Sequence, residues 1–238
     1  MLETVTIGGA TCALDYAHSY AEKYLTDHLN EDDAEAKVWS YPAYDSYRGS
    51  SNGQVGDADL LAVALLNAGR NPVKAYYGLQ HLLPEINKRL AHPALEGTLI
   101  DAGPDTIEAI VDLYNVANEG RASYGRALHV RLTVLSKVLH RKKPELLPLI
   151  DRFIRCCYIW RGDPAPLARF ASDPESRDFI SAWIQAAQHD LKAGEEQWQQ
   201  LADLAPDPQI SPLRAMDIIG WKLGQLTRDQ LKVLIRTS

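Results

Sequence analysis

The sequence has few cysteines and no long apolar run, and both absences limit what the protein can be. Its 238 residues include only three cysteines, Cys12, Cys156 and Cys157, with no Cys-x-x-Cys pair. Adjacent cysteines rarely bridge each other, so we interpret all three as packing residues in a reducing cytoplasm. No stretch of about 18 uninterrupted apolar residues occurs, so we expect no membrane span. The start, MLETVTIGGA, lacks the basic and apolar regions of a signal peptide.

Familiar motifs of nucleotide, metal and hydrolase sites are also absent. There is no GxxxxGK phosphate loop, no GxGxxG after a strand, no HExxH and no GxSxG elbow. The seven histidines show no ligand spacing to one another. We therefore expect no metal ion and no cofactor, and the sequence leaves open whether the protein is an enzyme.

Signals for helix ends are frequent, whereas strand signals are scarce. Asn71–Pro72, Asp173–Pro174 and Ser211–Pro212 each place a capping residue before a first-turn proline. Such signals recur roughly every 20–35 residues, as expected of successive helices of ordinary length. The sequence therefore predicts an all-α fold, a compact multi-helix bundle. Residues 1–12 fit either a short strand or an extended arm.

The chain is long enough for one large hydrophobic core or for two small ones. No linker forces a division, and no internal repeat is present. We predict a single helical domain over residues 1–238, with a subdivision near residue 120 as the alternative.

Charge is distributed unevenly along the chain. The formal net charge is −6, yet the segment from Arg121 to Arg161 holds ten basic residues against Glu145 and Asp151. That segment carries +8, so the remainder of the chain carries −14. This asymmetry suggests a basic face on an acidic body, which would meet DNA, another polyanion or an acidic protein. The alternative is an ordinary solvated helix surface.

The centre of the basic segment is HRKKPELLPLID, residues 140–151. Pro144 should end the preceding helix, so the basic triplet would lie in its last turn, where cations favour the helix dipole. The alternative is a surface that holds a nucleic-acid backbone without reading its sequence. Its candidate residues are Lys137, His140, Arg141, Lys142, Lys143, Arg152 and Arg155.

Asp151 interrupts the apolar segment that follows. In a helix beginning near Pro148 its carboxylate would lie in the first turn, where the dipole favours it, and Arg155 is spaced for an ion pair. The alternative makes Asp151 a catalytic carboxylate at the rim of a cleft, where it would activate water or stabilise a cationic transition state.

The loop from Ser40 to Asp57, rich in Gly, Ser, Asn and Tyr, is a second candidate site. Loops of this kind carry function more often than the scaffold does, although a plain connector is the alternative. Its candidate binding residues are Tyr44, Asp45 and Arg48. Trp160, next to Arg161, would stack on a base or, more often for such a residue, pack in the core.

The stretch KVLHRKKPELLPLIDRFIRC resembles part of the helix-hairpin-helix DNA glycosylases, where a helix leads to a proline–apolar–aspartate segment. The matching positions are Pro148, Ile150, Asp151, Ile154 and Arg155. The resemblance implies a nucleic-acid-associated protein with Asp151 as its catalytic residue. The chain departs from that family where a glycine-rich hairpin, LPGxGxxTA, should stand. VRLTVLSKVL occupies its place, and this removes a backbone-amide phosphate site.

Most of the chain also resembles an uncharacterised bacterial family of helical proteins of unknown function. The motifs that carry this likeness are YDSYRG, DADLLAVALLN, LHRKKPELLPLID and SPLRAMDIIGWKLG. The resemblance brings no known activity. It implies one shared surface for Tyr44, Asp45, Arg48, Arg141, Lys142 and Asp151.

Three hypotheses of function follow. The first is a nucleic-acid-associated protein that resembles the DNA glycosylases, with or without their chemistry. The second is a non-enzymatic helical module whose basic face docks an acidic protein. The third is a small-molecule enzyme that uses the Tyr44–Arg48 loop over a cleft.

Overall fold

The structure is a computed structural model that describes residues 3–27, 39–51, 53–67, 71–124 and 129–235. Within these residues the chain forms one two-stranded hairpin, ten α-helices and two short 3₁₀ helices. The helices are α1 (Leu14–Thr26), η2 (Asp57–Leu61), α2 (Ala62–Leu65), α3 (Pro72–Leu90), α4 (Pro104–Tyr124), α5 (Leu132–Lys142), α6 (Arg152–Ile159), η4 (Ala168–Phe170), α7 (Arg177–Ala193), α8 (Glu195–Ala202), α9 (Pro212–Gln225) and α10 (Arg228–Leu234). The predicted helical fold is confirmed.

Near the N-terminus the chain forms a short hairpin, which decides between the two structures left open there. Strand β1 (Thr4–Ile7) pairs antiparallel with β2 (Ala10–Ala13). In the turn, the Gly8 amide donates to Asp190 Oδ2 at 2.7 Å, and the Gly9 amide donates to the Cys157 carbonyl at 2.8 Å. A Cβ on Gly9 would fall 1.9 Å from the carbonyl oxygen of Arg161. The hairpin is therefore fastened to both α6 and α7.

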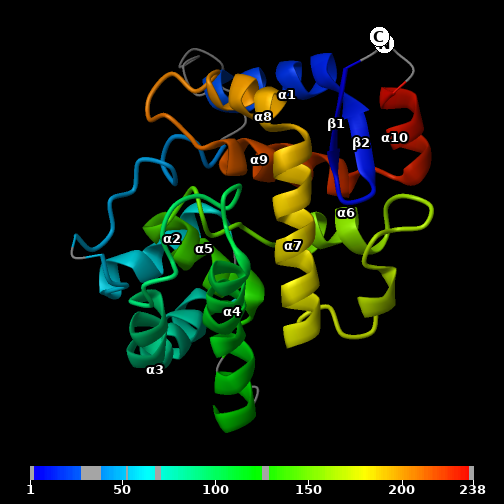
Figure 1. The fold of residues 1–238 in the computed structure, drawn as a ribbon. Coiled ribbons are helices and arrows are strands. Elements are labelled where there is room, and N and C mark those ends of the chain that lie inside the picture. The colour runs from blue at the N-terminus through cyan, green and yellow to red at the C-terminus, as the bar shows by residue number, and fades with distance from the viewer. Residues whose placement is uncertain (1–2, 28–38, 52, 68–70, 125–128, 236–238) are drawn as a thin grey trace.

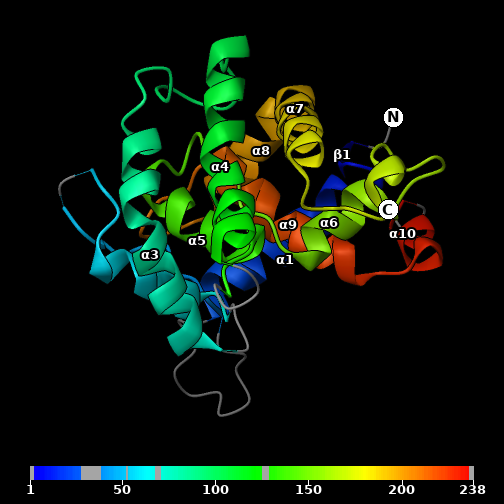
Figure 2. The ribbon, with the colours of Figure 1, turned by 90° about the horizontal axis from the view of Figure 1, so that it is seen from below.

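Two groups of elements lie around helix α7 (Figure 1). Helices α2, α3, α4 and α5 gather on one side, and α1, α8 and α9 lie across one end. The view from below shows the hairpin and α10 together at the side away from α3 (Figure 2). Helix α4 packs along α7, and α6 packs along α9.

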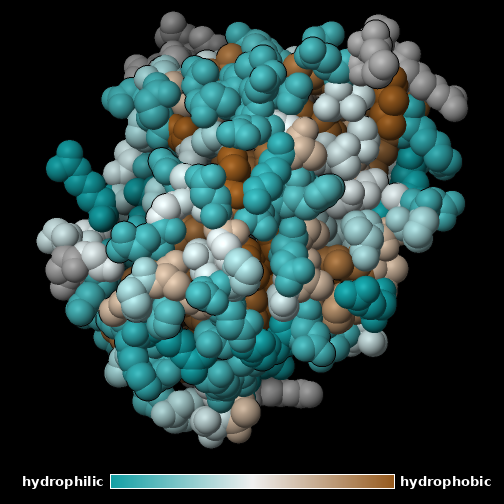
Figure 3. All heavy atoms as spheres, in the orientation of Figure 1, coloured by the Kyte–Doolittle hydropathy of each residue, from teal (hydrophilic) through white to brown (hydrophobic). Residues whose placement is uncertain are grey.

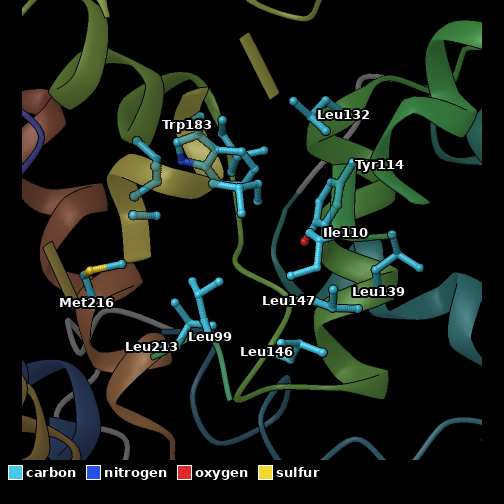
Figure 4. Close-up of a cluster of buried hydrophobic side chains, with 14 of the residues drawn as sticks. Leu99, Ile110, Tyr114, Leu132, Leu139, Leu146, Leu147, Trp183, Leu213 and Met216 are labelled. Atoms are coloured by element: carbon cyan, nitrogen blue, oxygen red, sulfur yellow. The ribbon is translucent and has the colours of Figure 1, made fainter. Parts of the chain in front are cut away.

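A buried cluster joins these groups across α7 (Figure 4). Trp183 of α7 meets Tyr114 of α4 edge to face, with ring centroids 5.9 Å apart. The Tyr114 hydroxyl donates to the Pro148 carbonyl at 2.6 Å, and Leu146 and Leu147 are buried in the same core. The ELLPLID segment thus begins in a turn, packs its leucines in the core and leads to Asp151 at the start of α6.

The close packing of α6 on α9 depends on a glycine. A Cβ on Gly224 would lie 2.0 Å from the Phe153 carbonyl oxygen, a distance that no side chain tolerates. Further along the same contact, the Cys157 thiol donates to the Gly220 carbonyl at 3.3 Å. Helix α9 therefore lies directly against the beginning of α6, which brings charged residues of both helices together.

Helix starts follow the local signals in part. Ser211 caps α9, because its hydroxyl accepts from the Arg214 amide at 3.1 Å, and Pro212 begins the helix as predicted. Helix α7 begins at Arg177 rather than at Pro174, because Ser176 and not Asp173 accepts from a first-turn amide. That leaves Glu175 in the turn before the helix.

The face drawn in Figure 3 is mostly hydrophilic, with hydrophobic residues in narrow patches. Among the described helices none has the length and apolar character needed to cross a bilayer.

Candidate functional site

A cavity of about 690 Å³ lies where α5, α6 and α9 meet. This is the usual size of a small-molecule site. Residues of α1 and of the loops at Trp39–Ser40 and Leu66–Asn67 complete its lining. Four aromatic side chains contribute to its walls: Tyr24, Trp39, Phe153 and Trp221.

The charged residues of the lining come from three helices and the residue before one of them. They are Lys137, Asp151, Arg152, Arg155, Arg214 and Asp217. Four cations against two carboxylates leave a formal charge of +2 on the lining. The cavity lining therefore combines aromatic side chains, charged side chains of both signs and a net positive charge.

Lys137 is the unusual member of this group. The residue is only 6% exposed, yet its Nζ makes no hydrogen bond or ion pair with any residue that the structure describes. Burial lowers the pKa of Lys137, while the carboxylates of Asp217 and Asp151 oppose that shift. A lysine whose side chain is buried, whose pKa is lowered and which lines a cavity is a typical mark of a functional site.

Arg214, by contrast, is fully engaged. Its guanidinium forms a two-point ion pair with Asp45, with Nε to Oδ1 at 2.9 Å and Nη2 to Oδ2 at 3.2 Å. Its Nη1 donates to Asp217, three residues on in α9. Burial raises the pKa of Asp217, although Arg214 and Lys137 oppose this. Arg214 thus holds the Asp217 carboxyl in place near Lys137.

Asp151 is the N-cap of α6. Its Oδ1 accepts from the amides of Phe153 at 2.7 Å and Ile154 at 3.0 Å. Its Oδ2 has no hydrogen-bond partner among the described residues, and Asp151 lines the cavity. The expected helix from Pro148 and the expected pair with Arg155 are wrong, because the helix begins at Arg152.

Arg155 instead pairs with Glu175. Its Nη1 lies 3.0 Å from Glu175 Oε1, and its side chain is 17% exposed. Arg152 is exposed, with its guanidinium 4.3 Å from the centre of the Phe153 ring. Both arginines line the cavity with Lys137, so three of the predicted basic residues do reach a common site.

The basic block at 140–142 is placed otherwise than predicted. His140 is buried, with Nδ1 2.7 Å from the Leu147 carbonyl, and burial lowers its pKa to about 3. Lys142 Nζ lies 2.7 Å from Asp59 Oδ1, and Arg141 Nη2 donates to the Tyr47 carbonyl at 2.7 Å. A phosphate clamp requires exposed side chains, so this prediction is wrong for His140 and Lys142. His140 instead contacts the Leu147 carbonyl, and Lys142 pairs with Asp59.

Lys143, the third residue of the triplet, is half-buried and makes no ion pair or side-chain hydrogen bond with the described residues. It is not part of the cavity lining.

The 40–57 loop contributes less directly than predicted. Tyr44 is fully buried, and its hydroxyl donates to the Lys137 carbonyl at 2.8 Å. Asp45 reaches the site only through Arg214, and Arg48 is exposed, away from the lining. Trp160 is 43% exposed, and its carbonyl accepts from Arg228 outside the cavity. Tyr44 is thus a packing residue beneath the site.

Among the described residues, no group of three or more histidine, cysteine or acidic side chains is arranged to hold a metal ion. The chemistry available at the cavity is that of an amine, two carboxyl groups and guanidinium donors.

Comparison with protein families gives a match over residues 17–224 to a family of unknown function, DUF6308. The chain belongs to DUF6308. The matched range contains every residue that lines the cavity. No curated protein and no solved structure matches the chain. The comparisons lend no support to the resemblance to DNA glycosylases.

The sequence-based prediction missed two charged residues of the DUF6308 cavity, Arg214 and Asp217. Both stand in SPLRAMDIIGWKLG, where their neighbours Leu213, Met216 and Ile218 are buried. Opposite charges three residues apart in an otherwise apolar helix indicate a buried pair, since isolated charges are seldom placed on such a face. That signal was present in the sequence.

Proposed function

We propose that this DUF6308 protein binds a nucleotide-like ligand, a planar heterocycle that carries negative charge, in the cavity between α5, α6 and α9. The observation that carries the proposal is Lys137, a buried lining lysine with no hydrogen bond or ion pair to the described residues, in a cavity with two carboxyl groups and aromatic walls. Each part of the ligand has a counterpart in the lining.

The aromatic walls favour a flat ring. Phe153 and Trp221 meet edge to face with centroids 6.0 Å apart, and Trp39 lies 5.0 Å from Tyr24. These contacts hold the rings in defined orientations, so they offer preformed surfaces for stacking. Stacking of a base on an aromatic side chain contributes about 1–3 kcal/mol.

The polar side chains of Lys137 and Asp151 in the lining favour a ring with both donors and acceptors on its edge. Lys137 can only donate, and the free Oδ2 of Asp151 accepts. A nucleobase has carbonyl or ring-nitrogen acceptors next to amino or imino donors, so it can satisfy both. A purely apolar ligand would leave these groups desolvated without partners, which is costly.

The cationic excess favours an anionic substituent such as phosphate. Arg152 is the exposed cation at the lining, and guanidinium groups bind phosphate with paired, charge-assisted hydrogen bonds. If the bound molecule is also a substrate, the Asp151 carboxylate is the base and the Lys137 ammonium the acid at hand. We therefore retain the first hypothesis, association with nucleic acid, and propose the cavity as the binding site.

Docking of an acidic protein has less support. That hypothesis needs an exposed basic face, whereas Arg141 and Lys142 bind groups of the 39–59 region.

Two substitutions of Asp151 separate its structural role from its role toward a ligand. Asp151→Asn should leave thermal stability nearly unchanged, because asparagine caps helices as well as aspartate does. It should weaken nucleotide binding about tenfold, since a charged acceptor is lost. Asp151→Ala should also lose about 1 kcal/mol of stability with the cap. Quenching of Trp39 and Trp221 fluorescence by the common nucleoside monophosphates would measure the binding.

The matched control is Asp229→Asn, a nearly fully exposed aspartate of α10. It should change neither the melting temperature nor the binding. The proposal is overturned if none of the nucleotides, free or within a single-stranded oligonucleotide, binds the wild-type protein. Unchanged nucleotide affinity in Asp151→Asn would remove Asp151 from the site.

A further inference from the structure

We infer that a second anion site, formed by Arg121, Arg131 and Arg155 around Glu175, adjoins the cavity and binds a backbone phosphate of single-stranded nucleic acid. This inference rests on the proposed function, because it takes the base of one nucleotide to lie in the cavity. It names the ligand as a strand and not as a free nucleotide.

The cluster gathers three guanidinium groups around one buried carboxylate. Glu175 is 7% exposed; its Oε2 lies 3.1 Å from Arg121 Nη1, and its Oε1 lies 3.0 Å from Arg155 Nη1. Arg131 Nη1 is 4.0 Å from Glu175 Oε1. These residues come from α4, from the cap of α5, from α6 and from the turn before α7. One carboxylate among three cations leaves a local charge of +2.

The guanidinium groups retain donors for a ligand. Each arginine has five N–H donors. The contacts to Glu175 use one nitrogen of Arg121 and one of Arg155, and the Arg131 contact is too long for a hydrogen bond. The side chains of Arg131 and Arg121 are 66% and 36% exposed, so their remaining donors face solvent. Glu175 therefore orients the cluster without neutralising it.

The cluster continues the cavity at one side. Arg155 lines the cavity and also binds Glu175, so it belongs to both sites. Thr133, two residues after Arg131, lines the cavity as well. On the other side, Arg121 and Glu175 line an open hollow of about 520 Å³. A ligand that leaves the cavity past Arg155 would pass directly over the exposed arginines.

The positions of the arginines favour a single strand over a mononucleotide as the ligand. The phosphate of a mononucleotide in the cavity would meet Arg152 or Arg155, which are lining residues. Arg121 and Arg131 lie outside the lining, so the phosphate that they would bind is a further one and not that of the nucleotide in the cavity. Single strands carry phosphates at regular intervals and leave their bases free to enter a pocket.

Binding of a labelled random-sequence oligonucleotide of about ten nucleotides, followed by fluorescence anisotropy, tests the inference. Arg131→Gln should weaken this binding about threefold to tenfold and reduce the dependence on salt by about one released ion. It should leave the affinity for mononucleotides unchanged. Glu175→Gln should act in the opposite direction, because it frees the arginines from their competing carboxylate, and strengthen oligonucleotide binding severalfold.

The matched control is Arg169→Gln, a surface arginine stacked on Phe170 in η4 and outside the cluster. It should bind the oligonucleotide as the wild-type protein does. The inference is overturned if Arg131→Gln and Arg169→Gln behave alike, if mononucleotide affinity falls as much as oligonucleotide affinity, or if duplex DNA binds more tightly than the single strand. If neither mononucleotides nor the oligonucleotide bind the wild-type protein, the proposed function fails with it; mononucleotide binding alone refutes only the second site.

Discussion

Replacing Lys137 by methionine is expected to make the protein more stable and, at the same time, unable to bind its ligand. Methionine has nearly the length of the lysine stem and fills the same space beside α9. It removes the charge of a buried side chain that has no hydrogen bond or ion pair with the described residues and whose ammonium is partly desolvated. Replacement of buried charges by apolar residues stabilises proteins by about 1–4 kcal/mol in favourable cases, and we expect about 2 kcal/mol here.

The loss of binding follows from the same atom. Lys137 is a buried lining cation with no carboxylate of the described residues within 4 Å, so a ligand is its natural partner. A hydrogen bond to a charged group contributes about 1.5–3 kcal/mol, which corresponds to a loss of roughly tenfold to a hundredfold in affinity. A side chain that serves only the fold would not show gain of stability together with loss of binding.

The lowered pKa of Lys137 also determines how the stability difference between the variant and the wild-type protein should change with pH. Burial lowers the pKa of Lys137 in the folded protein below the ordinary lysine value. Between these two values the unfolded chain binds a proton that the folded chain does not, so the stability of the wild-type protein rises with pH across that interval. The advantage of Lys137→Met should therefore be full below the folded pKa and shrink as the pH rises toward about 10.5.

Urea denaturation near neutral pH and near pH 10, combined with nucleotide titration, would measure both effects. Lys143→Met is the matched control, since Lys143 is half-buried, outside the cavity lining and without an ion pair or side-chain hydrogen bond to the described residues. A Lys137→Met protein that is less stable than wild type and still binds nucleotides would contradict the prediction.

The second large effect is a loss of stability in mild acid caused by His140. Burial lowers the pKa of His140 from 6.5 to about 3, opposed by its hydrogen bond to the Leu147 carbonyl. Between those values the unfolded chain is protonated at this histidine and the folded chain is not. Stability is therefore lost as the pH falls below 6.5. At about pH 4.5 the loss should be about 2.5 kcal/mol from this residue alone.

His140→Asn should remove this part of the acid sensitivity, because the asparagine amide can donate to the Leu147 carbonyl without titrating. The variant loses packing at neutral pH, so the quantity to compare is the change in unfolding free energy between about pH 7 and pH 4.5. His18→Asn, on the exposed face of α1, is the control for replacing a histidine away from the buried core. An unaltered pH dependence in His140→Asn would show that His140 is not the buried neutral group.

Local sequence signals were sufficient for the helical class and for several helix ends. Ser211 caps its helix as predicted, because a cap needs only a side-chain oxygen and an amide two or three residues away. The start of α7 was placed too early. Both Asp173 and Ser176 are good caps in isolation, and only the packing of the preceding turn around Glu175 selects between them.

The charge count found the basic segment but could not assign partners to it. Lys142 pairs with Asp59, and Arg155 pairs with Glu175, each across a long sequence separation. Which cations are neutralised depends on contacts of this kind. The net charge of a segment carries no information about them.

The sequence by itself determined that this chain is helical, that its positive charge is concentrated between residues 121 and 161, and that Asp151 stands at a helix start. Periodicity, composition and capping act over a few residues, so they can be read without a fold. The tertiary structure alone decided that Lys137 is buried without an ion pair to the described residues, that Asp151 and Asp217 line the same cavity, and that three arginines lie around Glu175. Burial and pairing arise where distant segments meet, and these two properties separate a structural charge from one left free for a ligand.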